Sequence, residues 1–435
     1  MSVLEATMLM PPKLRFDAAI PSRTHIDAYP GLRTHGPFDS SRVSLPPQSV
    51  LFVFPSALQP LAHQLAAAIR NGHGSVPSFQ TLFGVPLTGE TMTSLAIDAE
   101  LGSPEQAAAS YRSAIEAWSK HNNRPEPQLA FVLVPHSERW ETDRPYYQAK
   151  ASFARLGIPT QMVTTELVGD AKQFGWSIAN IGLQAFAKLG GIPWTIESPA
   201  EDTDIVIGVG RSDITRHDGI TRIFGYAVSF VGNGVYRQTW SFTPAADESE
   251  YEQRLEDALF AALSSDADLD QPARRLVLHL AKKTGHREIA AARRAMKRAG
   301  VSIPAAFLRL DDSTLFDLAD GSQETLAPPK GLAVRLDEWR MLLQSNGLTA
   351  LGPPDSPLLA ELNEESDVGS EALDELVAQA FRLSHANWRG FNARSKPVTL
   401  AYGDLLARLV GYLEEVSTWD PSLLRSELQS RPWFL

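Results

Sequence analysis

The sequence predicts a mixed α/β protein built from two successive units. The first half alternates apolar runs suited to strands with amphipathic helices, which implies a doubly wound, Rossmann-like sheet. From Asp204 onward, three closely spaced strands are followed by helix, strand, helix and strand, the order of a ribonuclease-H-like fold. A chain of 435 residues has room for two or three domains, each with its own core.

In the first half, the run Val50 to Phe54 is apolar throughout and predicts a strand buried on both faces. Ser103-Pro104-Glu105 is a helix start, with an N-cap serine followed by proline at the first helical position. The remaining predicted elements are a helix from Leu58 to about Arg70, a strand Leu129 to Val134, a helix from Tyr146, a strand at Gln161 and a helix ending at Gly190-Gly191.

In the second half, Gly232-Asn233-Gly234 is a hairpin sequence between two strands. The other predicted elements are strands at Asp204 to Val209, Arg222 to Val231, Val235 to Phe242, Leu276 to Leu280 and Ala305 to Leu310, and helices at about Ser249 to Leu263, Arg287 to Arg298, Glu371 to Ser384 and Asp404 to Val416. We expect residues 1–46 to form an extended segment packed on the body, residues 47–195 the first domain, and residues 196–435 the second.

Composition narrows the class of protein. There is no cysteine, which excludes disulfides, thiolate metal sites and cysteine nucleophiles. The N-terminus lacks the apolar core of a signal peptide, and no apolar run approaches the roughly 20 residues that span a bilayer, so we expect a cytoplasmic protein. The net charge of −11 is unevenly distributed, because residues 247–270 are acidic and residues 274–298 are basic. This asymmetry leaves a basic channel for a polyanion possible.

Polar side chains with helical spacing predict a phosphate site. Tyr146 and Lys150 lie four residues apart and share a helix face, as do Asn180, Gln184 and Lys188 on a second helix. Gln161 follows a turn between these helices. Lysines supply charge, and amides and phenols supply directed hydrogen bonds, which together suit a terminal phosphate. The alternative is that both polar faces are simply exposed to water.

The sequence around these residues resembles that of the Argonaute family. YYQAK, PTQ and NIGLQAFAKLGGIPW resemble the phosphate-binding MID domain, and DIVIGVG resembles the first strand of the PIWI domain. NWRGFNARSKPVTLAYGDLLARL and the terminal RPWFL also resemble PIWI. The similarity extends from about Tyr29 to Leu435 and is greatest to short prokaryotic Argonautes, which lack the N-terminal and PAZ domains.

The resemblance implies that Tyr146, Lys150, Gln161 and Lys188 hold the 5′ phosphate of a guide strand, with Asn180 and Gln184 beside them. It also implies that the carboxylate of Leu435, together with Gln161, holds a divalent metal, for which Mg²⁺ is suited. Otherwise RPWFL is an apolar tail that closes the core. For guide backbone contacts the candidates are Arg389, Arg394 and Lys396, each of which could instead be a solvated surface charge.

A second implication is that the nuclease centre is inactive. Catalytic relatives place an aspartate where this chain has Gly210, and a second one after the strand at Leu276 to Leu280, where this chain continues Ala281-Lys282-Lys283. Only Asp404 remains, and one carboxylate cannot build a two-metal site. Asp204 and Asp213 are interpreted as solvent-facing acids at a strand end or turn.

The resemblance therefore implies a guided sensor with an RNA guide and a DNA target. Such proteins work with a separate effector carrying a PAZ-analogue region, of the sirtuin-like, TIR-type or nuclease class, in defence against plasmids or phage. Two alternatives remain open. One is a metal-dependent guided endonuclease that uses Asp404 and acids not yet placed, and the other is an unrelated α/β enzyme that binds phosphorylated small molecules.

Overall fold

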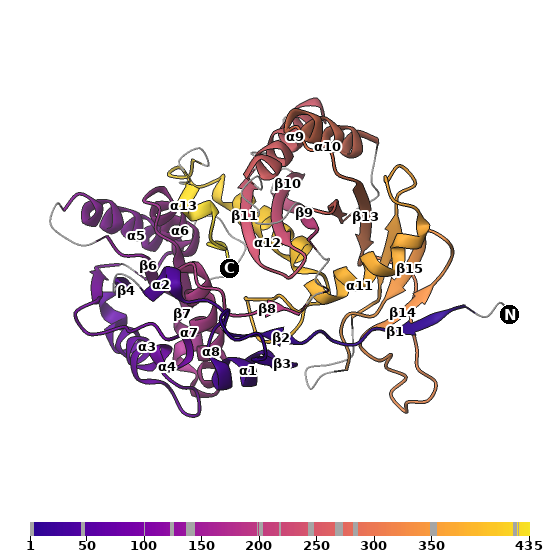
Figure 1. Ribbon diagram of the computed structural model, residues 1–435. Coiled ribbons are helices and arrows are strands. Elements are labelled where there is room, and N and C mark those ends of the chain that lie inside the picture. Colours follow the sequence, from indigo (N-terminus) through magenta and orange to yellow (C-terminus); the bar gives the residue numbers. More distant parts are fainter. Residues whose placement is uncertain are drawn as a thin grey trace.

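The structure is a computed structural model that describes residues 4–44, 48–99, 101–121, 126–135, 144–197, 199, 203–216, 219–241, 248–265, 273–281, 286–348, 355–420, 424 and 426–435. Two sheet-based units lie side by side, with the C-terminus between them (Figure 1). Their strands match most of the runs predicted from apolar patterning.

The first unit is a four-stranded parallel sheet in the order β5-β4-β6-β7. Because β4 and β6 are buried along their whole length, alternate residues pack on opposite faces: Phe52 stacks on Phe131 on one side, and Val53 and Val132 belong to the core on the other. Its elements are β4 (Val50–Pro55), η1 (Ser56–Leu58), α3 (Gln59–Asn71), α4 (Phe79–Phe83), β5 (Met92–Ile97), α5 (Pro104–Ser119), β6 (Leu129–Val134), α6 (Pro145–Arg155), β7 (Thr160–Thr164), α7 (Thr165–Gly169) and α8 (Ala171–Lys188).

Helix α8 has local start and stop features. The Asp170 side chain accepts hydrogen bonds from the backbone N–H groups of Lys172 and Gln173, each at 3.0 Å, and so caps the N-terminus. At the other end Gly190 adopts φ 98°, a conformation that favours glycine. The last turn places Lys188 against the core, where its side chain is fully buried.

The second unit is a nine-stranded sheet in the order β1-β14-β15-β16-β13-β12-β9-β10-β11. Strand β12 runs parallel to both β9 and β13, whereas the other pairs are antiparallel. Its elements are β9 (Ile205–Arg216), β10 (Gly219–Val231), β11 (Tyr236–Ser241), α9 (Glu248–Ser265), β12 (Leu276–Leu280), α10 (His286–Arg298), β13 (Ala305–Asp311), β14 (Leu332–Arg335), β15 (Arg340–Leu343), β16 (Leu358–Leu362), η3 (Ser370–Ala372), α11 (Leu373–Leu383), α12 (Val398–Leu413) and α13 (Ser426–Gln429).

The N-terminal segment connects the two units. Strand β1 (Ala6–Met8) pairs with β14 at one edge of the large sheet, and the segment then crosses to the other unit (Figure 1). There β2 (Leu14–Arg15), β3 (Thr24–His25) and β8 (Thr195–Ile196) form a small sheet, followed by α1 (Ala28–His35) and α2 (Ser41–Ser44). Among the helices of the described residues, none is long and apolar enough to span a membrane.

Helix α12 lies directly against β9, and two glycines of β9 make this possible. A Cβ atom at Gly210 would lie 2.0 Å from the carbonyl carbon of Gly403 and 2.4 Å from the amide nitrogen of Asp404. Such distances are far below van der Waals contact, and the obstacle is backbone rather than a movable side chain. Any larger residue at position 210 would therefore displace α12.

The basic stretch predicted to leave room for a channel is largely neutralised. On α10, Arg294 pairs with Glu256 at 2.6 Å and Arg298 pairs with Asp257 at 2.5 Å, both partners lying on α9. The acidic and basic runs of the sequence thus form the facing charged surfaces of α9 and α10. The two helices run parallel, since Glu252 pairs with Arg287 near the start of both helices and Asp257 pairs with Arg298 further along. The expectation of a basic channel along the described part of this stretch is wrong; Lys282 and Lys283 lie outside the described residues.

Asp204 is also not the solvent-facing acid predicted from the sequence. Its side chain is fully buried and accepts hydrogen bonds from Arg274 Nε at 3.0 Å, Arg275 Nε at 2.8 Å and Gln379 Nε2 at 2.8 Å. The carboxylate therefore joins the start of β9 to the residues before β12 and to α11. Asp213 lies within β9 rather than in a turn.

Replacing Asp204 with alanine should lower the free energy of unfolding by about 3 kcal/mol or more, because Arg275, only 5% exposed, loses its buried partner. Urea denaturation of both proteins measures the difference. The matched control is Asp374→Ala, which removes the Arg335 ion pair at an aspartate side chain that is 62% exposed, and should cost less than about 1 kcal/mol. Equal losses in the two variants would show that burial of Asp204 is not what matters.

Candidate phosphate-binding site

The predicted site residues converge where the two units meet. A pocket between α6, β7, α8 and α12 is lined by Tyr146, Gln161, Gln184, Arg389, Arg408 and the terminal residue Leu435. We call this the junction pocket. Lys150 and Lys188 lie behind its lining, where both side chains are buried.

A chain of hydrogen bonds connects the buried lysine of α8 to the pocket surface. Lys188 Nζ donates to Gln161 Oε1 at 2.7 Å and to the Thr160 carbonyl at 2.9 Å. Gln161 Nε2 donates to Gln184 Oε1 at 3.3 Å, and Gln184 Nε2 donates to the Arg389 carbonyl at 2.8 Å. The chain fixes the orientation of both amides and ties the first unit to the loop before α12.

Lys150 is buried without a hydrogen-bond partner for its side-chain nitrogen in the part of the chain that the structure describes. Its side chain is 1% exposed, and Nζ has no hydrogen-bond partner among the described residues. The ammonium lies 5.9 Å from the ring centres of both Tyr146 and Trp433. Burial, and secondarily the charge of Arg389, lowers the pKa of Lys150 to about 7. An anion bound here would supply the missing partner.

Lys188 experiences the same environment. Burial lowers the pKa of Lys188 well below its usual value, and the neighbouring charges of Lys150 and Arg389 lower it further. Three cationic side chains are therefore close enough to repel one another around one small pocket. Such an arrangement favours a ligand with more than one negative charge, as a terminal phosphate has.

The C-terminal tail is both an apolar plug and a component of the pocket. Trp433 and Phe434 are each 2% exposed, with Trp433 stacked on Trp419 and Phe434 edge-on to Tyr402. These contacts hold the next residue, Leu435, at the junction pocket. The two sequence interpretations of RPWFL are thus compatible.

The donor atoms available here suit a hard divalent cation. The terminal carboxylate of Leu435 and Gln161 Oε1 would supply oxygen ligands, the chemistry that Mg²⁺ prefers, and bound phosphate oxygens would complete a set. Gln161 Oε1 already accepts a hydrogen bond from Lys188 Nζ, which leaves its second lone pair for a metal. Within the described residues no group of three His, Asp or Glu side chains is placed to hold a metal.

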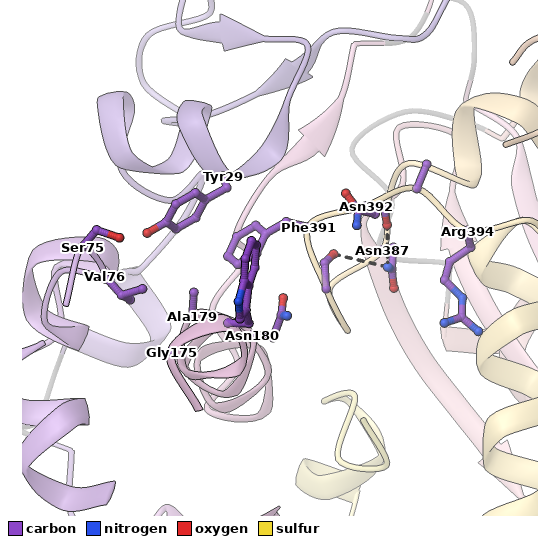
Figure 2. Close-up of a pocket in the computed structure, with 13 residues that line it drawn as sticks. Tyr29, Ser75, Val76, Gly175, Ala179, Asn180, Asn387, Phe391, Asn392 and Arg394 are labelled. Atoms are coloured by element: carbon purple, nitrogen blue, oxygen red, sulfur yellow. Dashed lines mark hydrogen bonds between the residues drawn. The ribbon is translucent and has the colours of Figure 1, made fainter. Parts of the chain in front are cut away.

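Asn180 is not brought into the junction pocket. It lines a separate cavity of about 480 Å³, together with Tyr29, Trp176 and the loop that carries Asn387 and Phe391 (Figure 2). The reason is helical geometry, because eight residues of α-helix separate Asn180 from Lys188 by roughly 12 Å along the axis. Asn180 Oδ1 is buried there without a hydrogen-bond partner.

The three predicted backbone-contact residues have different surroundings. Arg389 lines the junction pocket and Arg394 lines the second cavity. Lys396 instead forms ion pairs with Asp312 at 2.7 Å and Asp404 at 3.0 Å. A contact between Lys396 and a guide strand stays a prediction, and these two carboxylates would compete with it.

Sequence reasoning missed Arg408, which lines the junction pocket from α12. A usable feature was present, because α12 reads VTLAYGDLLARLVGYL and Arg408 is its one basic residue. Sequence reasoning also missed Tyr147, whose ring stacks on that of Tyr412 across the two units, with 5.3 Å between the ring centres.

Comparison with known proteins identifies the family. The Piwi domain family matches residues 131–415, well over half of the chain. The chain belongs to the Piwi domain family. Among its relatives, Protein argonaute of Cereibacter sphaeroides is 26% identical over 454 residues, which cover 94% of this chain and 56% of that protein. Piwi protein of Archaeoglobus fulgidus is 26% identical over 322 residues, covering 68% of this chain and 73% of the relative.

The fold agrees with this assignment. A structure of Clostridium butyricum Argonaute, bound to a guide DNA and a 19-mer target DNA, matches with a TM-score of 0.69 at 18% identity, over 94% of this chain and 53% of that one. The predicted fold class, a Rossmann-like unit followed by a ribonuclease-H-like PIWI unit, is confirmed. This Piwi chain spans little more than half the length of two of the three proteins compared.

The pKa of Lys150 predicts how phosphate binding should depend on pH. A bound phosphate would raise this pKa above 7, so from about pH 7 to 9 the complex holds more protons than the free protein. Affinity for a 5′-phosphorylated oligonucleotide should therefore fall as pH rises, by up to about tenfold per pH unit. Fluorescence anisotropy measures this, with a 5′-hydroxyl oligonucleotide as the control. Parallel pH profiles for the two oligonucleotides would contradict the assignment.

Proposed function

We propose that this Piwi chain binds a short guide strand by its 5′ phosphate and uses the guide to recognise a complementary target. The observation that supports this most directly is the junction pocket, where buried Lys150 and Lys188 lie behind the polar lining. Neither lysine has a carboxylate partner among the described hydrogen bonds and ion pairs. The pocket is therefore built to receive an anion.

We propose an RNA guide and a single-stranded DNA target, as the resemblance to short prokaryotic Argonautes implies. In such a system base pairing supplies sequence specificity, and the protein binds the backbone and the shape of the duplex. Tyr146, which lines the pocket from α6, would stack on the first base. Sequencing the nucleic acid that copurifies with the chain identifies guide and target directly.

We propose that the PIWI unit does not cut its target and instead activates a separate effector protein in defence against plasmids or phage. Two observations support the first part: Gly210 leaves no space for a side chain beside α12, and Asp404 is paired with Lys396. The effector would carry a PAZ-analogue region joined to a sirtuin-like, TIR-type or nuclease module. Copurification from the native host, followed by mass spectrometry, tests for this partner.

We propose Mg²⁺ as the cofactor of guide binding, held by the terminal carboxylate of Leu435, Gln161 and the phosphate. The metal would neutralise charge between the carboxylate and the phosphate, while Lys150, Lys188 and Arg389 position the phosphate. Adding one glycine after Leu435 should then weaken guide binding and reduce its sensitivity to EDTA. Unchanged affinity and unchanged EDTA sensitivity would remove the metal from the proposal.

The central test is a binding measurement with guides that differ only at the 5′ end. The wild-type chain should prefer the 5′-phosphorylated guide, and Lys150→Ala with Lys188→Ala should weaken its binding by about 100-fold, because two charged hydrogen bonds are lost. Lys172→Ala is the matched control, since this lysine lies exposed at the start of α8, the helix that carries Lys188. Equal binding of both guides by wild type would overturn the proposed function.

Cleavage assays test the inactive PIWI unit. With guide, complementary target and Mg²⁺ or Mn²⁺, we expect no cut by the wild type. Gly210→Asp should not restore activity, because its side chain meets the backbone of Gly403 and Asp404. Specific cuts that disappear in Asp404→Ala would instead favour a metal-dependent endonuclease.

A further inference from the structure

The loop from Asn387 to Lys396 connects both cavities of the molecule. Arg389 lines the junction pocket, whereas Gly390 to Arg394 line the cavity shown in Figure 2. Any ligand that extends from one cavity to the other must follow this loop. The position of the loop therefore controls how Arg389 and Arg394 are presented.

The beginning of the loop is anchored by hydrogen bonds to buried groups. The Trp388 backbone N–H donates to Tyr402 Oη at 2.6 Å, and its indole Nε1 donates to the Trp194 carbonyl at 3.2 Å. Inside the loop, Asn387 Nδ2 donates to the Asn392 carbonyl at 2.8 Å. These contacts fix residues 387–392 to both units.

The end of the loop is anchored by charge. Lys396 Nζ lies 2.7 Å from Asp312 Oδ2, just after β13, and 3.0 Å from Asp404 Oδ2 on α12. Burial opposes the charge of Lys396, but the two carboxylates outweigh it and raise the pKa of this lysine. The ammonium remains charged, and the three side chains together carry a net negative charge that does not favour a direct phosphate contact.

We propose that the cluster of Asp312, Lys396 and Asp404 positions the loop for guide binding, so that Asp404, the one acid retained of the nuclease centre, serves as a structural anchor for the guide site. This inference rests on the proposed guide binding. Lys396 is a positioning residue rather than a phosphate ligand. Asp404 is suited to this role because its backbone packs against Gly210, which holds α12 firmly on the sheet.

Two explanations of Lys396 make opposite predictions for the acids. If Lys396 contacts guide phosphates directly, removing the charge of Asp312 or Asp404 lessens repulsion of the polyanion and strengthens binding. If the cluster positions the loop, removing either acid releases Lys396 and weakens binding. The sign of the change therefore separates the explanations.

The experiment measures the affinity of the full chain for 5′-phosphorylated and 5′-hydroxyl guides in Asp312→Asn, Asp404→Asn, Lys396→Ala and Lys396→Ala with Asp404→Asn. We expect the preference for the 5′ phosphate to fall roughly fivefold in each single variant. The double variant should lose no more of this preference than Lys396→Ala does, because the residues belong to one ion-pair network. Lys396→Arg, which keeps the positive charge, should retain most of the preference. The slope of log affinity against log salt should stay unchanged in Lys396→Ala, whereas loss of a direct phosphate contact would reduce it by about one.

The chain offers a matched control. Arg309 pairs with Asp311 at 2.5 Å and Glu361 at 2.8 Å, and its side chain is 21% exposed, as is that of Lys396. This second cluster joins β13 to β16 and shares no hydrogen bond or ion pair with the loop among those described, so Arg309→Ala should lower the melting temperature without changing the preference for the 5′ phosphate.

The outcomes separate the two proposals. A wild-type chain that ignores the 5′ phosphate would overturn the proposed function itself. A wild-type chain that prefers the phosphate, combined with tighter or unchanged binding in Asp312→Asn, would overturn only the role of the cluster. Because the Asp312 side chain is 46% exposed, this variant should fold normally and keeps the test decisive even if Asp404→Asn is unstable.

Discussion

The burial of two lysine side chains at one site is the constraint on which the rest of this molecule depends. Because removing an ammonium from water is costly without a compensating partner, burial lowers the pKa of both lysines. Lys188 is compensated only by neutral oxygens, and Lys150 Nζ has no hydrogen-bond partner among the described residues. The folding energy of the surrounding cores must therefore hold both side chains in place until an anion arrives. A stable scaffold is used to maintain a binding site that is unfavourable when empty.

The scaffold achieves this by placing the site between two units rather than inside one. The first unit supplies the lysines and glutamines, and the second supplies Arg389, Arg408 and the chain terminus. Aromatic contacts such as Tyr147 on Tyr412, together with the hydrogen bond from Trp388 to Trp194, hold the two units in fixed positions relative to each other. Neither unit alone could build the pocket, so the binding of any ligand there and the association of the two units are energetically linked.

Many charged side chains of the second unit are paired within the protein. Asp204 binds arginines in the core, the α9 carboxylates neutralise α10, and Asp404 holds Lys396. In a ribonuclease-H-like fold that cuts nucleic acid, carboxylates must instead face metals and the scissile phosphate. The ion pairs here stabilise the fold, and they support the proposal that the chain recognises nucleic acid and leaves further chemistry to a partner.

The sequence by itself determined β4, β6, β7 and β9 to β13, the C-terminal end of α8 and the residue types of the junction pocket, because these depend on local patterning: apolar runs, a glycine after the helix and helical spacing. It left β5, β14 to β16 and the N-terminal strands unassigned, since these runs are short or only partly buried and carry little apolar pattern. Only the tertiary structure decided which charged side chains form ion pairs within the protein. Helical spacing grouped Asn180 with Lys188 although Asn180 lines a separate cavity and Lys188 lies behind the junction pocket, and the resemblance grouped Lys396 with Arg389 although two carboxylates bind Lys396. Ion pairs join residues far apart in the chain, so no local pattern reports them.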